Sequence, residues 1–154
     1  MWQVEEITDP DERTRICAAI TDSLPDWFGL PEANASYIEG GATKDAFVVR
    51  GADGTALGLL SLNHPYPSNV DIYWMGVRPG EHRKGIGRAL FEAALGRARE
   101  LGCETMTVET LSDSDPDPGY ARTREYYAAM GFKPLFELRP HGDNNPMLYM
   151  LKRL

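Results

Sequence analysis

Cysteine and histidine are scarce in this chain of 154 residues, which has two cysteines and three histidines. Cys17 and Cys103 lie far apart in the sequence, and no CxxC pair is present. This spacing argues against a disulfide framework and against a zinc site, because both need several closely placed Cys or His side chains. We therefore expect two reduced, structural thiols and no bound metal.

Long apolar runs are also absent. No segment approaches the roughly 18 apolar residues that a membrane-spanning helix needs. Residues 1–6 have neither the basic start nor the apolar run of a secretory signal. These absences lead us to expect a cytoplasmic protein that has no membrane partner.

Positive charge is in the minority, with 16 Lys and Arg against 23 Asp and Glu and a net charge of −7. Nucleic acid is a disfavoured partner, because a phosphate backbone requires a broad basic face. The chain contains 42% apolar and 25% charged residues, and no internal repeat is visible. This composition and length predict a single globular domain over residues 1–154.

The positive charges concentrate in one short segment that follows an apolar stretch ending at Val77. Between residues 78 and 88 the chain has four Lys or Arg and one acid, Glu81. Gly85 and Gly87 stand where this loop passes into a helical pattern. A helix N-terminus has unpaired N–H groups and a positive dipole end, and glycine lets an anion approach the backbone closely. The segment therefore predicts a phosphate-binding loop.

Two common phosphate motifs do not fit this loop. The P-loop needs Gly-Lys-Ser/Thr after a longer glycine loop, and that sequence is absent. The dinucleotide fingerprint needs a third glycine where this chain has Leu90, and it follows the first strand of a βαβ unit. Neither motif accounts for the loop.

A third pattern does fit. The residues His82-Arg83-Lys84-Gly85-Ile86-Gly87, after Val77-Arg78-Pro79, resemble the pyrophosphate loop of the GNAT N-acetyltransferase superfamily. That pattern is Gln/Arg-x-x-Gly-x-Gly/Ala after a strand ending in Val-x-Pro. This chain departs at the first position, where His82 replaces Gln or Arg, and the departure concerns a side-chain contact more than the loop backbone.

A second stretch is similar to the same family. Tyr126-Tyr127-x-x-x-Gly131-Phe132 matches the aromatic-Tyr-x-x-x-Gly-Phe signature of GNAT proteins. Upstream, Tyr120 and Thr123 stand where many members have Asn and Ala. A contact from that Asn to the pantetheine arm is therefore not implied for this chain.

Caps, turns and hydrophobic periodicity predict the element order βααβββαβαββ. Asp9 and Pro10 form an N-cap and a first helical residue, and Gly102 and Gly131 end two later helices. Residues 112–119 are acidic and interrupted by proline, which predicts an irregular loop. The predicted strands are 2–8, 46–49, 57–62, 70–77, 104–111, 133–139 and 147–152, and the predicted helices are 10–25, 31–37, 86–101 and 120–130.

The strand–helix–strand crossover over residues 70–111 implies two parallel strands and a right-handed connection. It places the phosphate loop at a strand's carboxyl end, where open α/β sheets bind ligands. The whole order also resembles the GNAT fold, an α/β class with a mixed sheet. That resemblance implies that strands 70–77 and 104–111 splay around acetyl-CoA.

The resemblance implies an acetyl-CoA-dependent N-acetyltransferase. Such an enzyme moves an acetyl group to a primary amine of a small molecule or peptide by direct attack. The thioester arm would bind the backbone of Met75 and Val77. The pyrophosphate would bind the loop and first helical turn: His82, Arg83, Lys84, Gly85, Ile86, Gly87, Arg88 and Ala89.

This chemistry needs two proton transfers. The attacking amine must be neutral, although a lysine-like amine has a pKa of about 10.4. The departing thiolate, with a pKa of about 8.5, gains from a proton donor. By the family resemblance the donor is Tyr127.

The residues leave the base open. Glu109 is the residue we select, and Asp71, Tyr73, His64 and Glu39 are alternatives that could each reach an acceptor in some arrangement. A water chain could also serve, because proximity alone contributes about 7–11 kcal/mol to such reactions.

The acceptor site is equally open. Asp71 and Tyr73 are candidate acceptor contacts, and in this superfamily the region of Trp27-Phe28-Gly29-Leu30 commonly forms a wall of the acceptor pocket. The aromatic pair Trp27 and Phe28 could instead pack in the core. The acidic residues 113–117 could attract a cationic amine or form a solvated turn. Together these features favour a small cationic or polar amine.

The sequence also allows a second, non-enzymatic function. The fold could retain its CoA site as a non-catalytic acyl-CoA-binding sensor or interaction module, although the presence of Tyr127 favours an enzyme. A homodimer is consistent with the family resemblance.

Overall fold

The structure is a computed structural model that describes residues 1–28 and 30–154. Gly29, within the predicted acceptor wall, lies outside the described residues. The elements are β1 (Val4–Ile7), α1 (Pro10–Asp22), α2 (Pro31–Gly40), a 3-10 turn η1 (Gly41–Thr43), β2 (Asp45–Arg50), β3 (Ala56–Tyr66), β4 (Asn69–Val77), α3 (Ile86–Glu100), β5 (Thr105–Leu111), α4 (Pro118–Ala129), β6 (Lys133–Leu138) and β7 (Met147–Arg153). This confirms the predicted order, with η1 as an addition.

All strands join one seven-stranded sheet in the order β1-β2-β3-β4-β5-β7-β6. Only β4 and β5 pair in parallel, and the other neighbours are antiparallel. The predicted mixed α/β sheet and the parallel central pair are therefore confirmed. Among the described residues, no helix combines the length and apolarity that crossing a membrane would require.

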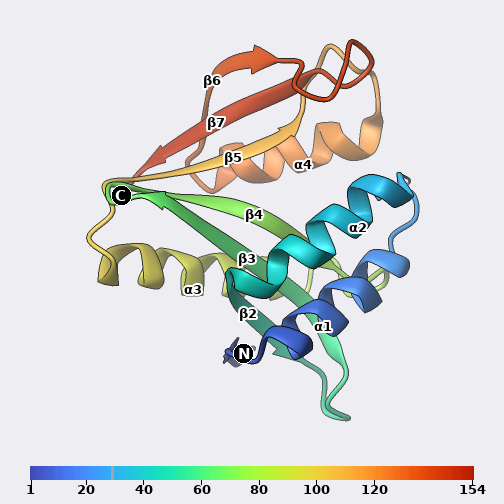
Figure 1. Ribbon diagram of the computed structural model, residues 1–154, viewed down its shortest axis with the longest axis vertical. Helices are drawn as coiled ribbons and strands as arrows, with labels where there is room; N and C mark the ends of the chain where they lie inside the picture. Colours follow the sequence, from blue (N-terminus) through green and yellow to red (C-terminus); the bar gives the residue numbers. More distant parts are fainter. Residues whose placement is uncertain (29) are drawn as a thin grey trace.

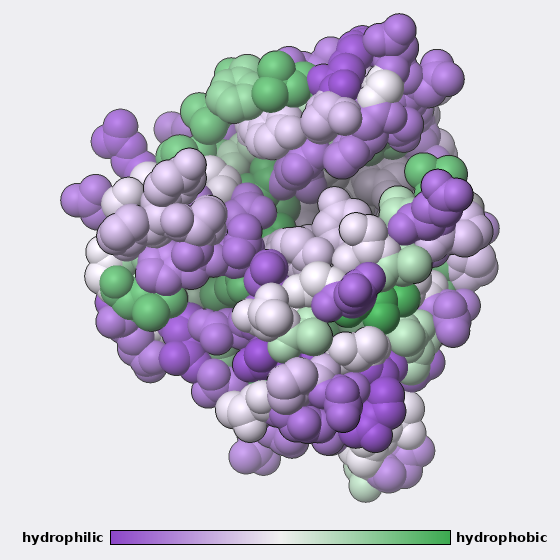
Figure 2. Space-filling view, in the orientation of Figure 1, coloured by the Kyte–Doolittle hydropathy of each residue, from purple (hydrophilic) through white to green (hydrophobic). Residues whose placement is uncertain are grey.

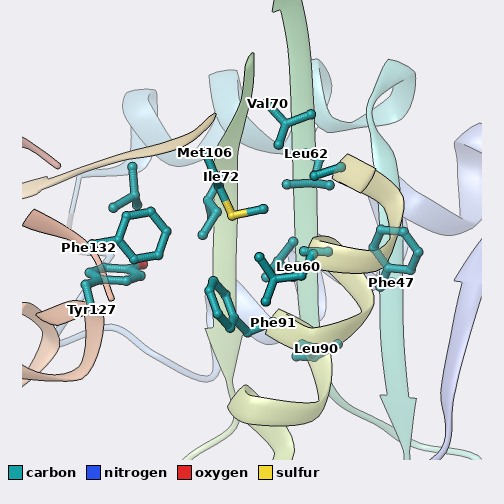
Figure 3. Close-up of a cluster of buried hydrophobic side chains, with 14 of the residues drawn as sticks. Phe47, Leu60, Leu62, Val70, Ile72, Leu90, Phe91, Met106, Tyr127 and Phe132 are labelled. Carbon is teal, nitrogen blue, oxygen red and sulfur yellow. The ribbon is translucent and has the colours of Figure 1, made fainter. Parts of the chain in front are cut away.

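Helices cover both faces of the sheet (Figure 1). Along β2, Ala46 and Val48 pack with α1, whereas Phe47 and Val49 pack with α3, because successive side chains of a strand point to opposite faces. The larger cluster continues into α4 and includes Tyr127 (Figure 3). Cys17 and Cys103 are free and buried, as expected for structural thiols.

The first helix begins as predicted but ends early. Asp9 caps α1 by accepting a hydrogen bond from the Glu12 N–H. The helix stops at Asp22 rather than at residue 25. The Ser23 hydroxyl donates to the Ile20 carbonyl, and the residue before Pro25 is disfavoured in helical conformation.

The second helix runs three residues longer than predicted and ends at Gly40. A Cβ at Gly40 would lie 2.1 Å from the Tyr73 hydroxyl oxygen, so only glycine lets α2 approach β4 this closely. Gly40 and Gly41 have helical φ angles of −63° and −66°. The glycine pair thus marks the end of α2, as the sequence indicates, and Gly40 also permits the close contact with Tyr73.

The acidic segment 112–119 is only partly irregular, and the prediction of a loop up to residue 119 was wrong. Pro118 begins α4, and Asp117 caps it by accepting from the N–H groups of Gly119 and Tyr120 at 2.7 and 3.2 Å. Asp117-Pro118 repeats the helix start of Asp9-Pro10. The acidic residues and prolines on either side of Asp117-Pro118 made this helix start hard to recognise in the sequence.

A β-bulge opens the sheet between β4 and β5. On β3, Leu62 pairs with Ile72 and Ser61 pairs with Trp74, which leaves Tyr73 as an extra residue. The parallel ladder to β5 ends at the pair Ile72–Val108. Because a bulge bends and twists its strand, β4 diverges from β5 beyond this point, and a gap forms at the carboxyl ends of both strands.

Candidate active site

A single cleft of about 1130 Å³ occupies this gap. It extends from the loop before α3 to the side chains of α2 and of the loop between β6 and β7. The space-filling view shows the surface hollowed between α2 and the β6–β7 end of the molecule (Figure 2). Most of the residues that the sequence predicts for a phosphate site and for an acceptor site therefore line opposite ends of one continuous space, which we call the phosphate end and the acceptor end.

The phosphate end is formed by an uncapped helix N-terminus. Gly85 has a left-handed φ of +86°, and no side chain caps α3. Arg83 also has a positive φ, +64°, which is uncommon for a residue with a Cβ. The first N–H groups of α3 are thus free to bind an anion, and Arg83 and Arg88 line the cleft beside them.

His82 contacts the end of β4. Its Nε2 lies 2.8 Å from the Val77 carbonyl oxygen, and its ring meets Trp27 edge-on at 6.1 Å between centroids. His82, Gly85, Ile86 and Gly87 line the cleft, whereas Lys84 and Ala89 are outside its lining. Lys84 pairs instead with Glu81 at 3.0 Å.

The backbone of Met75 and Val77 faces the gap. The Arg78 N–H donates to the Leu57 carbonyl, so the ladder to β3 uses even-numbered residues of this part of β4. Hydrogen-bonding direction alternates along a strand, and Met75 and Val77 therefore direct their N–H and C=O groups away from β3. This edge of β4 has no pairing with β5 beyond Ile72.

Tyr127 lies on α4 at the inner wall of the cleft and is 8% exposed. Its ring packs against Tyr126 and Phe132, each at 5.7 Å between centroids. Figure 3 shows its hydroxyl oxygen on the side that faces Ile72, which also lines the cleft. Burial raises the pKa of the Tyr127 phenol well above its usual range, and the neighbouring Tyr126 adds to this. The phenol is thus neutral at physiological pH.

The sequence pattern identified Tyr126 only as the aromatic residue before Tyr127, without a role. Its hydroxyl is buried and has no hydrogen-bond partner among the described residues. A Cβ placed on Gly87 would be 3.1 Å from this oxygen, so the hydroxyl lies directly over the first turn of α3. Burial raises the pKa of Tyr126 to about 12, and the Arg88 charge opposes that rise.

Trp2 also supports the phosphate end, and sequence reasoning gave no indication of it. Its indole Nε1 donates to the Lys84 carbonyl at 2.7 Å, across 82 positions of sequence. The contact fixes the peptide just before Gly85. No local pattern signals a contact between residues so far apart.

The acceptor end contains two carboxylates. Asp71 accepts a hydrogen bond from the Thr107 hydroxyl at 2.7 Å. Burial raises the pKa of Asp71 to about 6, the Thr107 bond opposes this, and the nearby Glu109 charge adds to it. Glu109 lines the cleft, whereas Asp71 lies outside the lining and pairs with Thr107, two residues before Glu109. Glu109 Oε1 is buried and lies 3.4 Å from Nε2 of His141.

Tyrosines surround these acids. Tyr37 of α2 and Tyr73 of β4 line the cleft with their rings 5.3 Å apart, and the Lys44 ammonium lies 5.1 Å from the Tyr73 ring centroid. Tyr149 is the cross-strand partner of Glu109. Burial, and then the Glu109 charge, raise the pKa values of both Tyr37 and Tyr149.

Trp27 and Phe28 both line the cleft and both pack in the core. Phe28 stacks on Trp74 at 5.3 Å, and the Trp27 carbonyl accepts from the Tyr120 hydroxyl at 2.9 Å. The two interpretations of this pair are therefore compatible. Two other candidate bases, His64 and Glu39, are not among the described residues that line the cleft.

The acidic residues 113–117 have structural contacts. Asp115 accepts from the Asp117 N–H at 3.0 Å, and Asp117 caps α4. Asp113 is exposed and lies outside the cleft lining. Within residues 1–28 and 30–154, no group of three or more His, Cys, Asp or Glu is placed to hold a metal ion.

Comparisons with known proteins agree with this geometry. The mycothiol acetyltransferase of Beutenbergia cavernae is 32% identical over 83 residues, which are 54% of this chain and 26% of that protein. The chain thus matches about a quarter of that relative's length. A ribosomal-protein-S18-alanine N-acetyltransferase from Escherichia coli superposes with a TM-score of 0.76 at 16% identity, covering 99% of this chain and 94% of that chain.

An aminoglycoside 6'-N-acetyltransferase complexed with coenzyme A superposes with a TM-score of 0.73, also at 16% identity, over 98% of this chain and 96% of that chain. These two structures establish the fold. The model of the acetyltransferase (GNAT) family matches residues 10–132, from the start of α1 to the residue before β6. With most of its length matched by that model, this chain belongs to the GNAT acetyltransferase family.

Proposed function

We propose that the protein transfers an acetyl group from acetyl-CoA to a primary amine of a small molecule or peptide. One observation carries the proposal. A single cleft joins an uncapped, basic helix N-terminus to a carboxylate-bearing pocket through the gap between β4 and β5. Such a cleft can align a phosphate-tailed thioester with a nitrogen nucleophile, and alignment supplies a large part of the rate enhancement.

The residues present fit acetyl-CoA. The free N–H groups at the start of α3, with Arg83 and Arg88, would hold the pyrophosphate. The backbone groups of Met75 and the Val77 N–H, which have no partner on β5, would bind the amides of the pantetheine arm, whereas the Val77 carbonyl contacts His82. The buried Tyr126 hydroxyl, which lacks a partner among the described residues, would gain one from the same molecule. Acetyl-CoA supplies the activated acetyl group.

Tyr127 is the proposed general acid. In the reaction the amine nitrogen bonds to the thioester carbonyl carbon, the carbon–sulfur bond breaks, and the sulfur leaves with the electron pair. The Tyr127 phenol, which is neutral at physiological pH, donates a proton to that sulfur. Loss of a general acid costs about 10²–10⁴-fold in rate.

Glu109 is the proposed base. It lines the cleft one position beyond the last β4–β5 pair, so it lies beside the gap where the amine would attack. The attacking nitrogen must lose a proton, and the Glu109 carboxylate would accept it directly or through a water molecule. The burial of Oε1 strengthens its interaction with an ammonium by reducing solvent screening.

Product identification tests this function. The purified protein is incubated with isotopically labelled acetyl-CoA and a panel of amines, and mass spectrometry identifies labelled products. Calorimetry measures CoA binding in the same samples. N-acetylated products support the proposal. Tight CoA binding without any product would instead identify a non-catalytic acyl-CoA-binding sensor, and labelled O-acetyl products would refute the amine acceptor.

A further inference from the structure

The cleft has opposite charge at its two ends. Arg83, Arg88 and Arg122 are the Lys and Arg side chains among the described residues that line it, and Arg83 and Arg88 belong to the phosphate loop and the first turn of α3. Around Glu109 the described lining contains no Lys or Arg. One end is therefore suited to an anion, and the other end is suited to a cation.

The side chains around Glu109 form a pocket of the kind that binds cations. Thr107 and Glu109 alternate along β5 with the buried Met106 and Val108, so they face the α2 side of the sheet. The rings of Tyr37 and Tyr73 contact each other and line the cleft on this side of the sheet. A tyrosine face attracts cations, and the Lys44 ammonium already lies 5.1 Å from the Tyr73 centroid.

Two carboxylates act on this pocket. Glu109 lines it, and Asp71 lies outside the lining but close enough for the Glu109 charge to raise its pKa. Asp71 pairs with Thr107 across the β4–β5 ladder, two residues before Glu109 on β5. The His141 imidazole contacts Glu109, with Nε2 lying 3.4 Å from Oε1. It belongs to the loop between β6 and β7, and its side chain is 55% exposed. An imidazole on a surface loop can yield its place to a ligand.

We propose that the acceptor is a molecule with two positively charged nitrogens, a diamine or polyamine, which displaces His141 from Glu109. This inference rests on the proposed function and names its substrate class. One nitrogen enters the gap beside Glu109 and is acetylated. The second stays charged against the field of Asp71 and the face of Tyr37, while Lys44 lies over the Tyr73 ring. An amino acid is disfavoured because its carboxylate would meet these acids.

A matched series of acceptors tests the proposal. The series contains 1,4-diaminobutane, 1-aminobutane and 4-aminobutanoate, which share a four-carbon spacing and differ in charge, with the diamines and monoamines of three, five and six carbons beside them. We expect kcat/KM for the best diamine to exceed that of its monoamine by more than about tenfold, the factor that 1.4 kcal/mol of extra binding gives. The aminobutanoate should be the poorest acceptor.

Variants locate the source of this preference. Asp71→Asn keeps the shape of the residue and its ability to accept from Thr107, and it should reduce the diamine-to-monoamine ratio several-fold. Glu109→Gln should reduce the same ratio further, whatever it does to the absolute rate. Asp113→Asn, an exposed acid outside the cleft, is the matched control and should leave the ratio unchanged.

Binding separates this inference from the proposed function. Calorimetry of 1,4-diaminobutane and 1-aminobutane with the CoA-loaded protein does not depend on turnover. Diamine binding that weakens in Asp71→Asn, without acetylation of any amine, would refute the proposed function and retain the cation pocket. Acetylation of monoamines as efficiently as diamines at every chain length would overturn the cation inference and retain the function.

Discussion

Asp71 allows a quantitative test of the site, because its carboxylate is half-buried near another acid. Its pKa rises from 3.8 to about 6 on folding. Each pKa unit corresponds to about 1.4 kcal/mol, so an ionised Asp71 destabilises the folded protein by about 3 kcal/mol. The substitution Asp71→Asn removes this charge and retains an oxygen that can accept from Thr107.

The sign of the pH dependence follows from the direction of the shift. Between pH 4 and pH 6 the folded state binds the Asp71 proton more tightly than the unfolded chain does, so this group makes stability fall as pH rises. The Asp71→Asn variant has no carboxylate at this position, so it does not lose this stability as pH rises. Relative to wild type, the variant should gain about 3 kcal/mol in unfolding free energy between pH 4 and pH 7.

Urea unfolding of wild type and Asp71→Asn at pH 4, 5, 6 and 7 measures this gain. The difference between the two proteins cancels the titration of all other groups to first order. Thr107→Val provides a check, because loss of its hydrogen bond should move the wild-type transition to higher pH. A difference in stability that stays constant from pH 4 to pH 7 would show that Asp71 is not buried as described and would refute the reasoning.

Three further substitutions test the phosphate end and the fold. Gly87→Ala puts a Cβ 3.1 Å from the Tyr126 hydroxyl and should raise KM for acetyl-CoA while α3 still folds, as circular dichroism would show. Trp2→Phe keeps the ring and loses the bond to the Lys84 carbonyl; calorimetry should show CoA binding weakened roughly 2–10-fold, as expected for one hydrogen bond. Asp117→Ala removes the α4 cap and should lower the unfolding free energy by about 1 kcal/mol in urea titrations, whereas an unchanged midpoint would contradict the cap.

The parts of the fold that the sequence predicted are those with local signals. Asp9-Pro10 marks a helix start within two residues, and the basic, glycine-containing pattern that predicts a phosphate loop lies within residues 78–88. The crossover rule then fixes the parallel β4–β5 pair. Such features depend on contacts over a few positions, which a single sequence displays directly.

The parts that escaped prediction depend on distant contacts. The bulge at Tyr73 arises from the register of β4 on β3, and no residue type at this position predicts a bulge. The bond from Trp2 to the phosphate loop and the contact of His141 with Glu109 join segments that meet only in the folded sheet. The start of α4 could have been predicted from the sequence, because Asp117-Pro118 is the same helix-start pattern as Asp9-Pro10.

The candidate site shows the same division. The sequence located Glu109 and Tyr127 on separate elements but could not tell which acids share the cleft. The structure brings Glu109 and Tyr73 to the cleft and leaves His64 and Glu39 outside its lining. The choice among acids required the pairing of β4 with β5, which places Asp71 and Glu109 near each other.

The roles of the two adjacent tyrosines test the proposed mechanism most directly. Steady-state kinetics with acetyl-CoA and an accepted amine would compare Tyr127→Phe with Tyr126→Phe, each of which loses one hydroxyl and keeps its ring. We expect Tyr127→Phe to lower kcat by about 10²–10⁴-fold with CoA affinity unchanged, and Tyr126→Phe to raise KM for acetyl-CoA with little change in kcat. Full turnover by Tyr127→Phe would contradict proton donation from Tyr127 and with it the account of this site.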